Sequence, residues 1–198
     1  LLEELKGRFP RLLVQHRPGK QGIGSAHFEA ITWAYQQGYE LVVTMDCDFT
    51  HLPSDVPALL AAARECDVAV GSRWLQPNSL PGWNLFRRLM TNMGHWLTRR
   101  VLGVPQDASG AFRAYRLDRV PRPLFDLVKA RGYAFFFESL FILNRNGLVI
   151  REVPIVLPAR TYGHSKMSRS AALRSGLHIF KLWLANLRRP EQFLTERK

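Results

Sequence analysis

Cysteine, acidic residues and long apolar runs are all scarce in this 198-residue chain, and each scarcity excludes a class of protein. The two cysteines, Cys47 and Cys66, lie far apart and form no C-x-x-C pair, which is typical of a reducing compartment and not of a disulfide scaffold. No apolar run approaches the roughly 18–20 residues that span a bilayer. The acidic first residues do not read as a signal peptide. We therefore expect a cytoplasmic protein without a membrane span.

The shortage of acidic residues leaves the chain strongly basic. Lys and Arg number 28 against 16 Asp and Glu, which gives a formal net charge of +12. A surplus of this size points to anionic partners such as phosphate esters, nucleic acid or an anionic lipid surface. No helix-turn-helix, RNA-recognition or zinc pattern accompanies the charge. A basic nucleic-acid-binding module is therefore kept as the competing hypothesis, and no nucleic acid is expected as the partner.

Apolar patterns along the chain predict alternating strands and helices. With 46% hydrophobic residues and no repeat or linker, residues 1–198 are expected to form a single domain. The alternation favours an α/β fold with a mostly parallel sheet flanked by helices, in which ligands bind beyond the carboxyl ends of the strands. The segment 41–45 is apolar on both faces, which predicts a central strand. The predicted strands are 11–16, 41–45, 67–70, 111–116 and 149–156.

Two carboxylates follow the predicted strand 41–45, in the sequence Asp46-Cys47-Asp48. In an extended chain residues i and i+2 point the same way, so both carboxylates can face one cation. Mg²⁺ or Mn²⁺ takes one or two protein carboxylates and completes its shell with diphosphate oxygens. A D-x-D pair also occurs by chance in a chain of this acidity. Its position at the end of a buried strand favours the metal site over a solvated surface pair.

Three further features contain candidates for the functional site. Arg73 follows the next predicted strand, and its guanidinium can grip a phosphate, although an ordinary surface arginine is the alternative. A loop that contains Arg160, Ser165 and Lys166 precedes the last helix and is either a ligand-covering loop or a solvated one. Glu138 follows three phenylalanines, so it lies either on the opposite helix face or in a site, and we favour the site.

Taken in order, these motifs resemble dolichyl-phosphate mannosyltransferase and its polyprenyl-phosphate relatives, within glycosyltransferase family 2. The likeness extends over nearly the whole chain. The matching segments are Met45 to His51, Gly71-Ser72-Arg73-Trp74, Asp107 to Arg113, Gly132 to Phe135 with Glu138, Glu152 to Ile155, and Arg160-x-x-Gly163-x-Ser165-Lys166.

The resemblance implies a GT-A type, nucleotide-diphospho-sugar transferase fold. It also implies transfer of a sugar, most often mannose from GDP-mannose, to a polyprenyl phosphate with inversion. The implied cofactor is Mg²⁺ or Mn²⁺, held by Asp46 and Asp48. The implied partners are a nucleotide-sugar donor and a polyprenyl-phosphate acceptor at a membrane surface. The catalytic candidates are Asp48, Arg73 and Glu138, and the substrate-binding candidates are Arg73, Arg87, Arg160, Ser165 and Lys166.

The chain departs from the family pattern at its start, because it begins after the family's first strand and nucleotide-binding segments. We therefore expect a sheet without its N-terminal strand, in an N-terminally truncated enzyme. A UDP-glucose-dependent glucosyltransferase and a catalytically dead fragment remain alternatives. The apolar residues of the last helix either lie against anionic lipid, as in a peripheral membrane protein, or pack on the sheet. This apolar face consists of Leu173, Leu177, Phe180, Leu184 and Leu187, and it is followed by Arg188 and Arg189.

Overall fold

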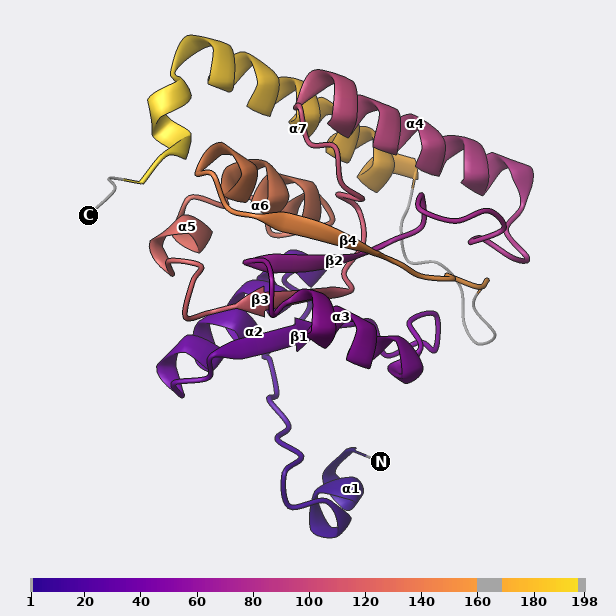
Figure 1. Ribbon diagram of the computed structural model, residues 1–198, viewed down its shortest axis with the longest axis vertical. Coiled ribbons are helices and arrows are strands. Elements are labelled where there is room, and N and C mark those ends of the chain that lie inside the picture. Colours follow the sequence, from indigo (N-terminus) through magenta and orange to yellow (C-terminus); the bar gives the residue numbers. More distant parts are fainter. Residues whose placement is uncertain (1, 160–168, 196–198) are drawn as a thin grey trace.

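The computed structural model describes residues 2–159 and 169–195, which form a central four-stranded sheet with helices on both faces (Figure 1). The α/β class predicted from the sequence is confirmed. The strands are β1 (Leu41–Thr44), β2 (Val68–Ser72), β3 (Arg113–Arg116) and β4 (Ile150–Pro154). The helices are α1 (Leu2–Arg8), α2 (Ile23–Gln36), α3 (Val56–Ala62), α4 (Leu85–Val101), α5 (Pro123–Asp126), α6 (Ala134–Arg145) and α7 (Arg169–Arg188), with 3₁₀ turns at Pro53–Asp55 and Pro190–Phe193.

The order of the strands in the sheet is β1-β3-β2-β4. Strand β3 runs antiparallel to both β1 and β2, while β2 and β4 are parallel. The prediction of a mostly parallel sheet is therefore wrong for the described strands. The chain leaves the sheet at the end of β2, passes through α4 and re-enters at the same edge, because Arg113 at the start of β3 pairs with Val70 near the end of β2. Although α4 lies between β2 and β3 in the chain, the two strands are therefore antiparallel.

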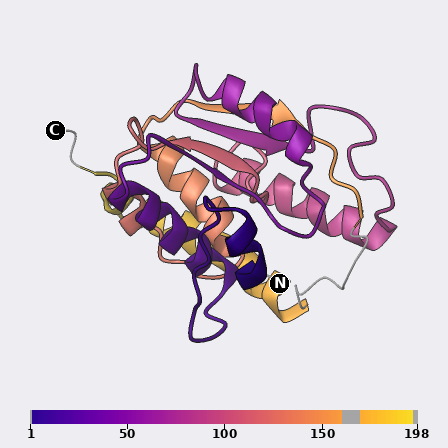
Figure 2. The same ribbon diagram turned by 90° about the horizontal axis from the view of Figure 1, so that it is seen from below.

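Both faces of strand β2 are buried, and this places the sheet between two hydrophobic clusters. Val68 and Val70 contribute to the larger cluster, which is formed with α2, α5 and α6. Ala69, between them, contributes to the smaller cluster, which contains Leu59 of α3. Figures 1 and 2 show α3 on one face of the sheet and α2 and α6 on the other. This alternation follows from the two-residue period of a strand.

Two sequence predictions about strands need correction. The segment 41–45 was expected to be central, but β1 lies at one end of the strand order, and its first three residues are only half-buried. Residues 11–16, all of which the structure describes, form no strand. A strand is stabilised by hydrogen bonds to a neighbouring strand. An apolar pattern therefore yields a strand only where the fold brings such a neighbour alongside.

Helices α4 and α7 pack against each other above the larger cluster (Figure 1). Ile179 and Leu182 of α7 are buried in that cluster. The apolar face of α7 predicted from the sequence is a different one, and each of its five residues is at least 40% exposed. The alternative in which that face packs on the sheet is therefore wrong. Among the helices that the structure describes, none is both long enough and apolar enough to cross a membrane.

The first turn of α2 approaches the loop before α6 so closely that a side chain at Gly24 is excluded. A Cβ atom at Gly24 would lie 2.3 Å from the Cβ of Phe135 and 2.6 Å from the carbonyl oxygen of Gly132. The backbone N–H of Ser25 donates to the carbonyl of Arg131 in the same contact. Gly94, in α4, has no atom within 4 Å of its virtual Cβ. Two helical glycines thus differ in whether a methyl group fits.

The Gly24→Ala substitution is expected to lower the free energy of unfolding by about 2–3 kcal/mol, because the overpacked backbone must move. The matched substitution Gly94→Ala is expected to raise it by up to about 1 kcal/mol through helix propensity alone. Urea denaturation of both variants measures the difference. Equal stability of the two variants would contradict the close contact between α2 and the segment before α6.

Candidate active site

A cavity of about 310 Å³ lies where the strand ends meet helices α4, α6 and α7. Strands β1 and β2 end at this edge, and β3 begins there because it runs antiparallel to both. The segments that follow β1 and β2, and the loop that leads into β3, therefore converge on one place. Asp46, Arg73 and Ser109 come from these three segments, and all three line the cavity. We call this cavity the cleft.

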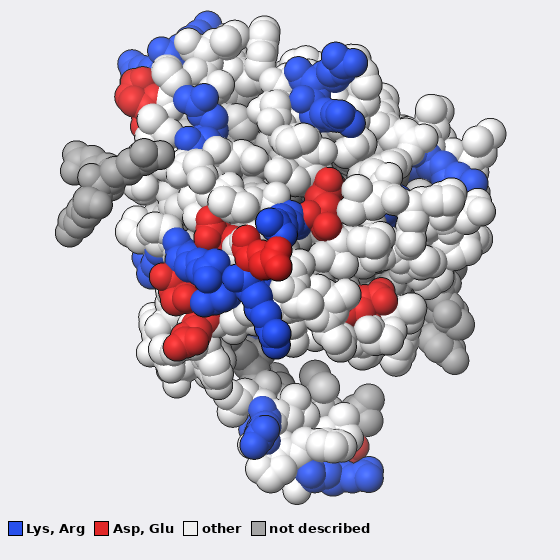
Figure 3. Space-filling view, viewed as in Figure 1, with Lys and Arg blue, Asp and Glu red and all other residues white. Residues whose placement is uncertain are grey.

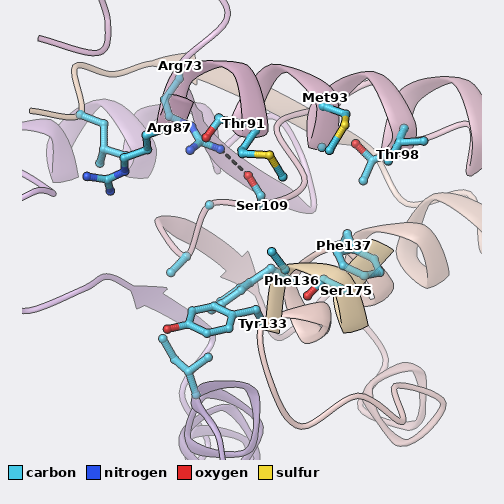
Figure 4. A pocket seen from close by; sticks show the side chains of 18 of the residues that line it. Arg73, Arg87, Thr91, Met93, Thr98, Ser109, Tyr133, Phe136, Phe137 and Ser175 are labelled. Carbon is cyan, nitrogen blue, oxygen red and sulfur yellow. Dashed lines mark hydrogen bonds between the residues drawn. The ribbon is translucent and has the colours of Figure 1, made fainter. Parts of the chain in front are cut away.

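Arg73 is held by Asp107 in a buried ion pair at the polar end of the cleft. The Arg73 Nε donates to Oδ2 of Asp107 at 2.7 Å, and Nη2 donates to Oδ1 at 2.5 Å. Nη2 also donates to the Ser109 hydroxyl at 2.5 Å, which Figure 4 shows as a dashed line. The side chains of Arg73 and Asp107 are 7% and 1% exposed. Arg73 therefore enters the cleft wall in one fixed orientation.

The ion pair determines the charge state of both side chains. Burial alone would raise the pKa of Asp107, but the Arg73 guanidinium outweighs it and lowers that pKa below its usual value. Asp107 in turn raises the pKa of Arg73 against the effect of burial. The backbone N–H of Asp107 donates to Oε1 of Glu152 on β4 at 2.8 Å. The sequence motifs include Asp107 without a role for it, and the structure shows it as the carboxylate that offsets the buried charge of Arg73.

Short hydrogen bonds shape the D-x-D segment after β1. Oδ1 of Asp48 accepts from the hydroxyl and the backbone N–H of Thr50, at 2.6 and 3.2 Å. The backbone N–H of Asp46 donates to Nδ1 of His51 at 2.9 Å. The His51 ring stacks on Phe112 with the ring centroids 5.0 Å apart. The two carboxylates thus lie on a turn that is fixed from both sides.

His51 acts on this turn as a neutral ring. Burial lowers the pKa of His51 to about 4, so Nδ1 carries no proton at neutral pH and accepts the Asp46 N–H. The ring is 4% exposed. From the sequence, His51 was only the last residue of the matching segment Met45 to His51 and had no role of its own. The position of His51 three residues after the D-x-D motif was the signal that could have singled it out.

Phe49, inside the same turn, has a strained backbone. Its φ is 62°, in the left-handed region that residues with a side chain rarely adopt. Its side chain is 70% exposed, so packing contributes little to hold it there. Thr50 and His51 follow Phe49, and their hydrogen bonds to Asp48 and Asp46 span it and maintain the conformation. Strain of this kind is frequent at functional sites.

The donor atoms of this turn fit a divalent cation that is shared with a substrate. Asp46 and Asp48 are both half-buried and offer the hard oxygen ligands that Mg²⁺ and Mn²⁺ prefer. In residues 2–159 and 169–195, no three His, Cys, Asp or Glu side chains gather into a closed metal site. The chain thus offers two carboxylates and leaves the remaining ligand positions to oxygens of a diphosphate or water. This is the donor set expected of a nucleotide-diphosphate site and not of a structural metal.

Arg113 joins two walls of the cleft from below. It is fully buried, and its Nη2 donates to the carbonyls of Ala108 at 3.0 Å and Phe136 at 2.8 Å. Nη1 donates to the hydroxyls of Tyr115 and Ser139. Every acceptor that the structure describes for Arg113 is neutral. The loop before β3 and the start of α6 are thus held in register around a buried positive charge.

The other end of the cleft is apolar. One face of α4 and one face of α7 lie opposite the start of α6, and Figure 4 shows Met93, Phe136 and Phe137 on these walls. Gly94 and Gly176 leave open space beside them, since neither has an atom within 4 Å of a virtual Cβ. The apolar lining residues are Ile23, Met90, Met93, Leu97, Phe136, Phe137, Leu157, Ala172 and Ile179.

The sequence-predicted site residues fall into three groups. Asp46, Arg73 and Arg87 line the cleft, and Asp48 lies on the turn beside it. Arg160, Ser165 and Lys166 lie outside the described residues.

Glu138 forms the third group, since it is not among the described residues that line the cleft. Its oxygens accept the backbone N–H groups of Lys129 at 3.1 Å and Ala130 at 2.8 Å. Oε2 also pairs with Nε2 of His178 on α7 at 3.1 Å. Glu138 is 1% exposed and therefore joins the loop after α5, helix α6 and helix α7 in one contact. Three hydrogen-bond partners thus satisfy its oxygens, which is what a buried carboxylate requires.

The chain is similar to known proteins in sequence and in structure. Residues 1–121 match the profile described as Glycosyl transferase family 2. The chain is 35% identical over 177 residues to undecaprenyl-phosphate mannosyltransferase of Micrococcus luteus, covering 89% of this chain and 73% of that protein. It is 33% identical over 162 residues to polyprenol monophosphomannose synthase of Mycolicibacterium smegmatis, covering 81% of this chain and 61% of that protein. A structure assigned as a nucleotide-diphospho-sugar transferase of Desulfovibrio desulfuricans G20 is 18% identical, with a TM-score of 0.44 over 92% of this chain and 71% of that chain.

Relief of the strained backbone at Phe49 should change the free energy of unfolding. The Phe49→Gly substitution is expected to raise the free energy of unfolding by about 1 kcal/mol, because glycine adopts a positive φ without a Cβ clash. Asn78→Gly is the matched control, at a φ of 54° that asparagine tolerates, and should change stability less. Urea denaturation measures both variants. A loss of stability in Phe49→Gly would contradict the assignment of strain to this turn.

Proposed function

Because the chain belongs to glycosyl transferase family 2, we propose that it transfers mannose from GDP-mannose to a polyprenyl phosphate at the cleft. One observation carries the proposal. A single cavity joins a polar end, with Asp46, Arg73 and Arg87, to an apolar end between α4, α6 and α7. A lipid phosphate acceptor has the same two halves. The names of the two curated relatives support mannose as the sugar and polyprenyl phosphate as the acceptor.

The reaction needs positioning more than it needs a base. A phosphate monoester has a second pKa of about 6, so the acceptor oxygen is already a nucleophile at neutral pH. That oxygen attacks C1 of mannose and forms a new C–O bond while the C1–O bond to the nucleotide diphosphate breaks, with inversion at C1. Arg73 supplies positive charge at the reacting phosphate groups, and Arg87 faces the phosphate of the acceptor.

Asp46 and Asp48 are the residues that we propose hold Mg²⁺ or Mn²⁺. When bound, the cation neutralises charge on the diphosphate leaving group. Thr50 orients the Asp48 carboxylate and His51 holds the Asp46 backbone, so the turn is shaped before a ligand arrives. Arg160, Ser165 and Lys166 are kept as proposed substrate-binding residues.

The apolar end of the cleft is the place proposed for the first units of the polyprenyl chain. Gly94 and Gly176 lie on facing helices and leave open space at the cleft wall. The aromatic rings of Phe136 and Phe137 close the side formed by α6. A lipid chain that enters here places its phosphate toward Arg87, which lies on the same helix as Gly94.

The same two helices support a peripheral membrane location. Helix α4 leaves Leu85, Phe86 and Leu89 at least 62% exposed, and the predicted face of α7 is exposed beside it. Basic residues flank both stripes, and Figure 3 shows the upper part of the molecule as mostly white, with separate blue patches and a red patch at the upper left. The exposed basic residues on these helices are Arg88, Arg99, Arg100, Arg174, Lys181 and Arg188. Apolar stripes flanked by cations fit an anionic lipid surface.

Activity is tested with GDP-mannose, polyprenyl phosphate and Mg²⁺ or Mn²⁺, with lipid-linked mannose as the readout. Asp46→Asn and Asp48→Asn are expected to lower kcat/KM by about 100-fold or more, since charge stabilisation of the leaving group is lost. Asp126→Asn is the matched control. Asp126 pairs with Arg122 at the surface and is not among the described cleft-lining residues, so the change should alter kcat/KM little.

Two outcomes of that assay would contradict the proposal. Use of UDP-glucose in preference to GDP-mannose would replace mannose with glucose as the transferred sugar. Formation of no lipid-linked sugar from either donor would remove the transferase assignment to this cleft.

Membrane association is tested by flotation with vesicles that contain phosphatidylglycerol. The double substitution Leu177→Glu and Phe180→Glu is expected to weaken binding about 10-fold or more, because buried apolar area and attraction to the anionic surface are both lost. Leu60→Glu is the matched control, as an exposed leucine of α3 on the other face of the sheet. Equal binding by all three proteins would contradict docking through α7.

A further inference from the structure

The guanidinium of Arg87 lies over an indole ring in the wall of the cleft. Its guanidinium carbon is 3.6 Å from the ring centroid of Trp83. Both side chains line the cleft. Trp83 is 8% exposed and forms a small hydrophobic cluster with Leu80 and Leu157. The ring is therefore a fixed surface, and the guanidinium is placed against it.

Backbone contacts hold this ring in position from two sides. Asn84 caps α4 and accepts the backbone N–H of Arg87 at 2.8 Å, so the first helical turn is fixed next to Trp83. The backbone N–H groups of Leu157 and Ala159 donate to the carbonyls of Ser79 and Pro81, at 2.7 and 2.9 Å. The loop before α4 and the segment after β4 are thus joined beneath the indole.

Stacking preserves the donors that a phosphate needs. The N–H groups of a guanidinium lie in its plane, so contact through its face does not itself occupy them. An arginine side chain otherwise loses considerable rotamer entropy when it is ordered by a ligand. A ring that orders the side chain beforehand removes part of this loss from the binding step. Trp83 thus contributes to anion binding without forming a bond to the anion.

We propose that Trp83 is a positioning residue that holds the Arg87 guanidinium for the phosphate of the lipid acceptor. The inference rests on the proposed function, in which Arg87 faces that phosphate. The role predicts an effect on acceptor affinity and none on the bond-breaking step. It also predicts that the aromatic face is what matters, so phenylalanine should replace tryptophan and an aliphatic residue should not.

Steady-state kinetics with polyprenyl phosphate test the role. Trp83→Leu is expected to raise the acceptor KM about 5- to 20-fold, the range that corresponds to a partly buried cation–π contact. The kcat and the KM for GDP-mannose should stay within about twofold of the wild type, because the contact acts on acceptor binding alone. Trp83→Phe should return the acceptor KM to within about threefold, since phenylalanine keeps a π face. A Trp83→Phe variant as weak as Trp83→Leu overturns stacking as the cause.

A double-mutant cycle separates positioning from packing. In an Arg87→Ala background, Trp83→Leu should leave the acceptor KM unchanged to within about twofold, because the group that Trp83 positions is gone. If Trp83→Leu raises that KM as much in the Arg87→Ala background as in the wild type, Trp83 acts through the fold and the proposal fails. Thermal unfolding of each variant verifies that the fold is retained.

Direct binding of farnesyl phosphate, with farnesol as the control without phosphate, distinguishes this inference from the function on which it rests. The wild type should bind farnesyl phosphate, and Trp83→Leu should weaken that binding about 5- to 20-fold. Unchanged binding by Trp83→Leu overturns the positioning role alone. Absence of farnesyl phosphate binding by the wild type overturns the acceptor assignment and the positioning role together.

Discussion

The buried ion pair between Arg73 and Asp107 is the contact on which the rest of the site depends. It joins the end of β2 to the loop that enters β3, and the backbone of Asp107 is anchored in turn to Glu152 on β4. Removal of either partner would leave an uncompensated charge in an apolar setting, which is strongly destabilising. Three segments that are distant in the sequence therefore meet at Asp107. The orientation of Arg73 in the cleft is a consequence of that meeting.

The cleft is organised as a polar end and an apolar end with different structural origins. The polar end is built from segments after β1 and β2 and before β3, and hydrogen bonds fix each one before any ligand binds. The apolar end is built from facing surfaces of α4, α6 and α7. Arg113 connects the two ends by binding the carbonyls of Ala108 and Phe136. Helices α4 and α7 serve twice, since one face of each lines the cleft and another is exposed.

Sequence patterns located the elements of this fold more reliably than their arrangement. Four of the five strands predicted from the sequence correspond to β1, β2, β3 and β4. The D-x-D motif, Arg73 and Arg87 were all identified, and Asp46, Arg73 and Arg87 line the cleft. The direction of β3 was not identified, because strand and helix periodicity carry no information about which edge of the sheet a returning chain enters.

Side-chain partners were also beyond what the residues alone could specify. No role for His51 follows from the sequence. In the structure, burial keeps its ring neutral and lets it accept the backbone N–H of Asp46. Glu138 was favoured for the site because an unpaired buried charge is costly. The structure satisfies its carboxylate with two backbone N–H groups and His178. A buried polar side chain needs a hydrogen-bond partner, and the sequence alone does not show which residue supplies it.

The sequence by itself determined the net positive charge, the α/β class and most of the strands. The order of its motifs also indicated the family. Helix caps, strand runs and short motifs depend on neighbours within a few residues, so they can be read directly. Only the tertiary structure decided that β3 reverses direction, that Asp107 holds Arg73, and that the indole of Trp83 supports Arg87. It also decided which face of α7 is buried. These features depend on contacts between distant segments, and a one-dimensional pattern does not contain them.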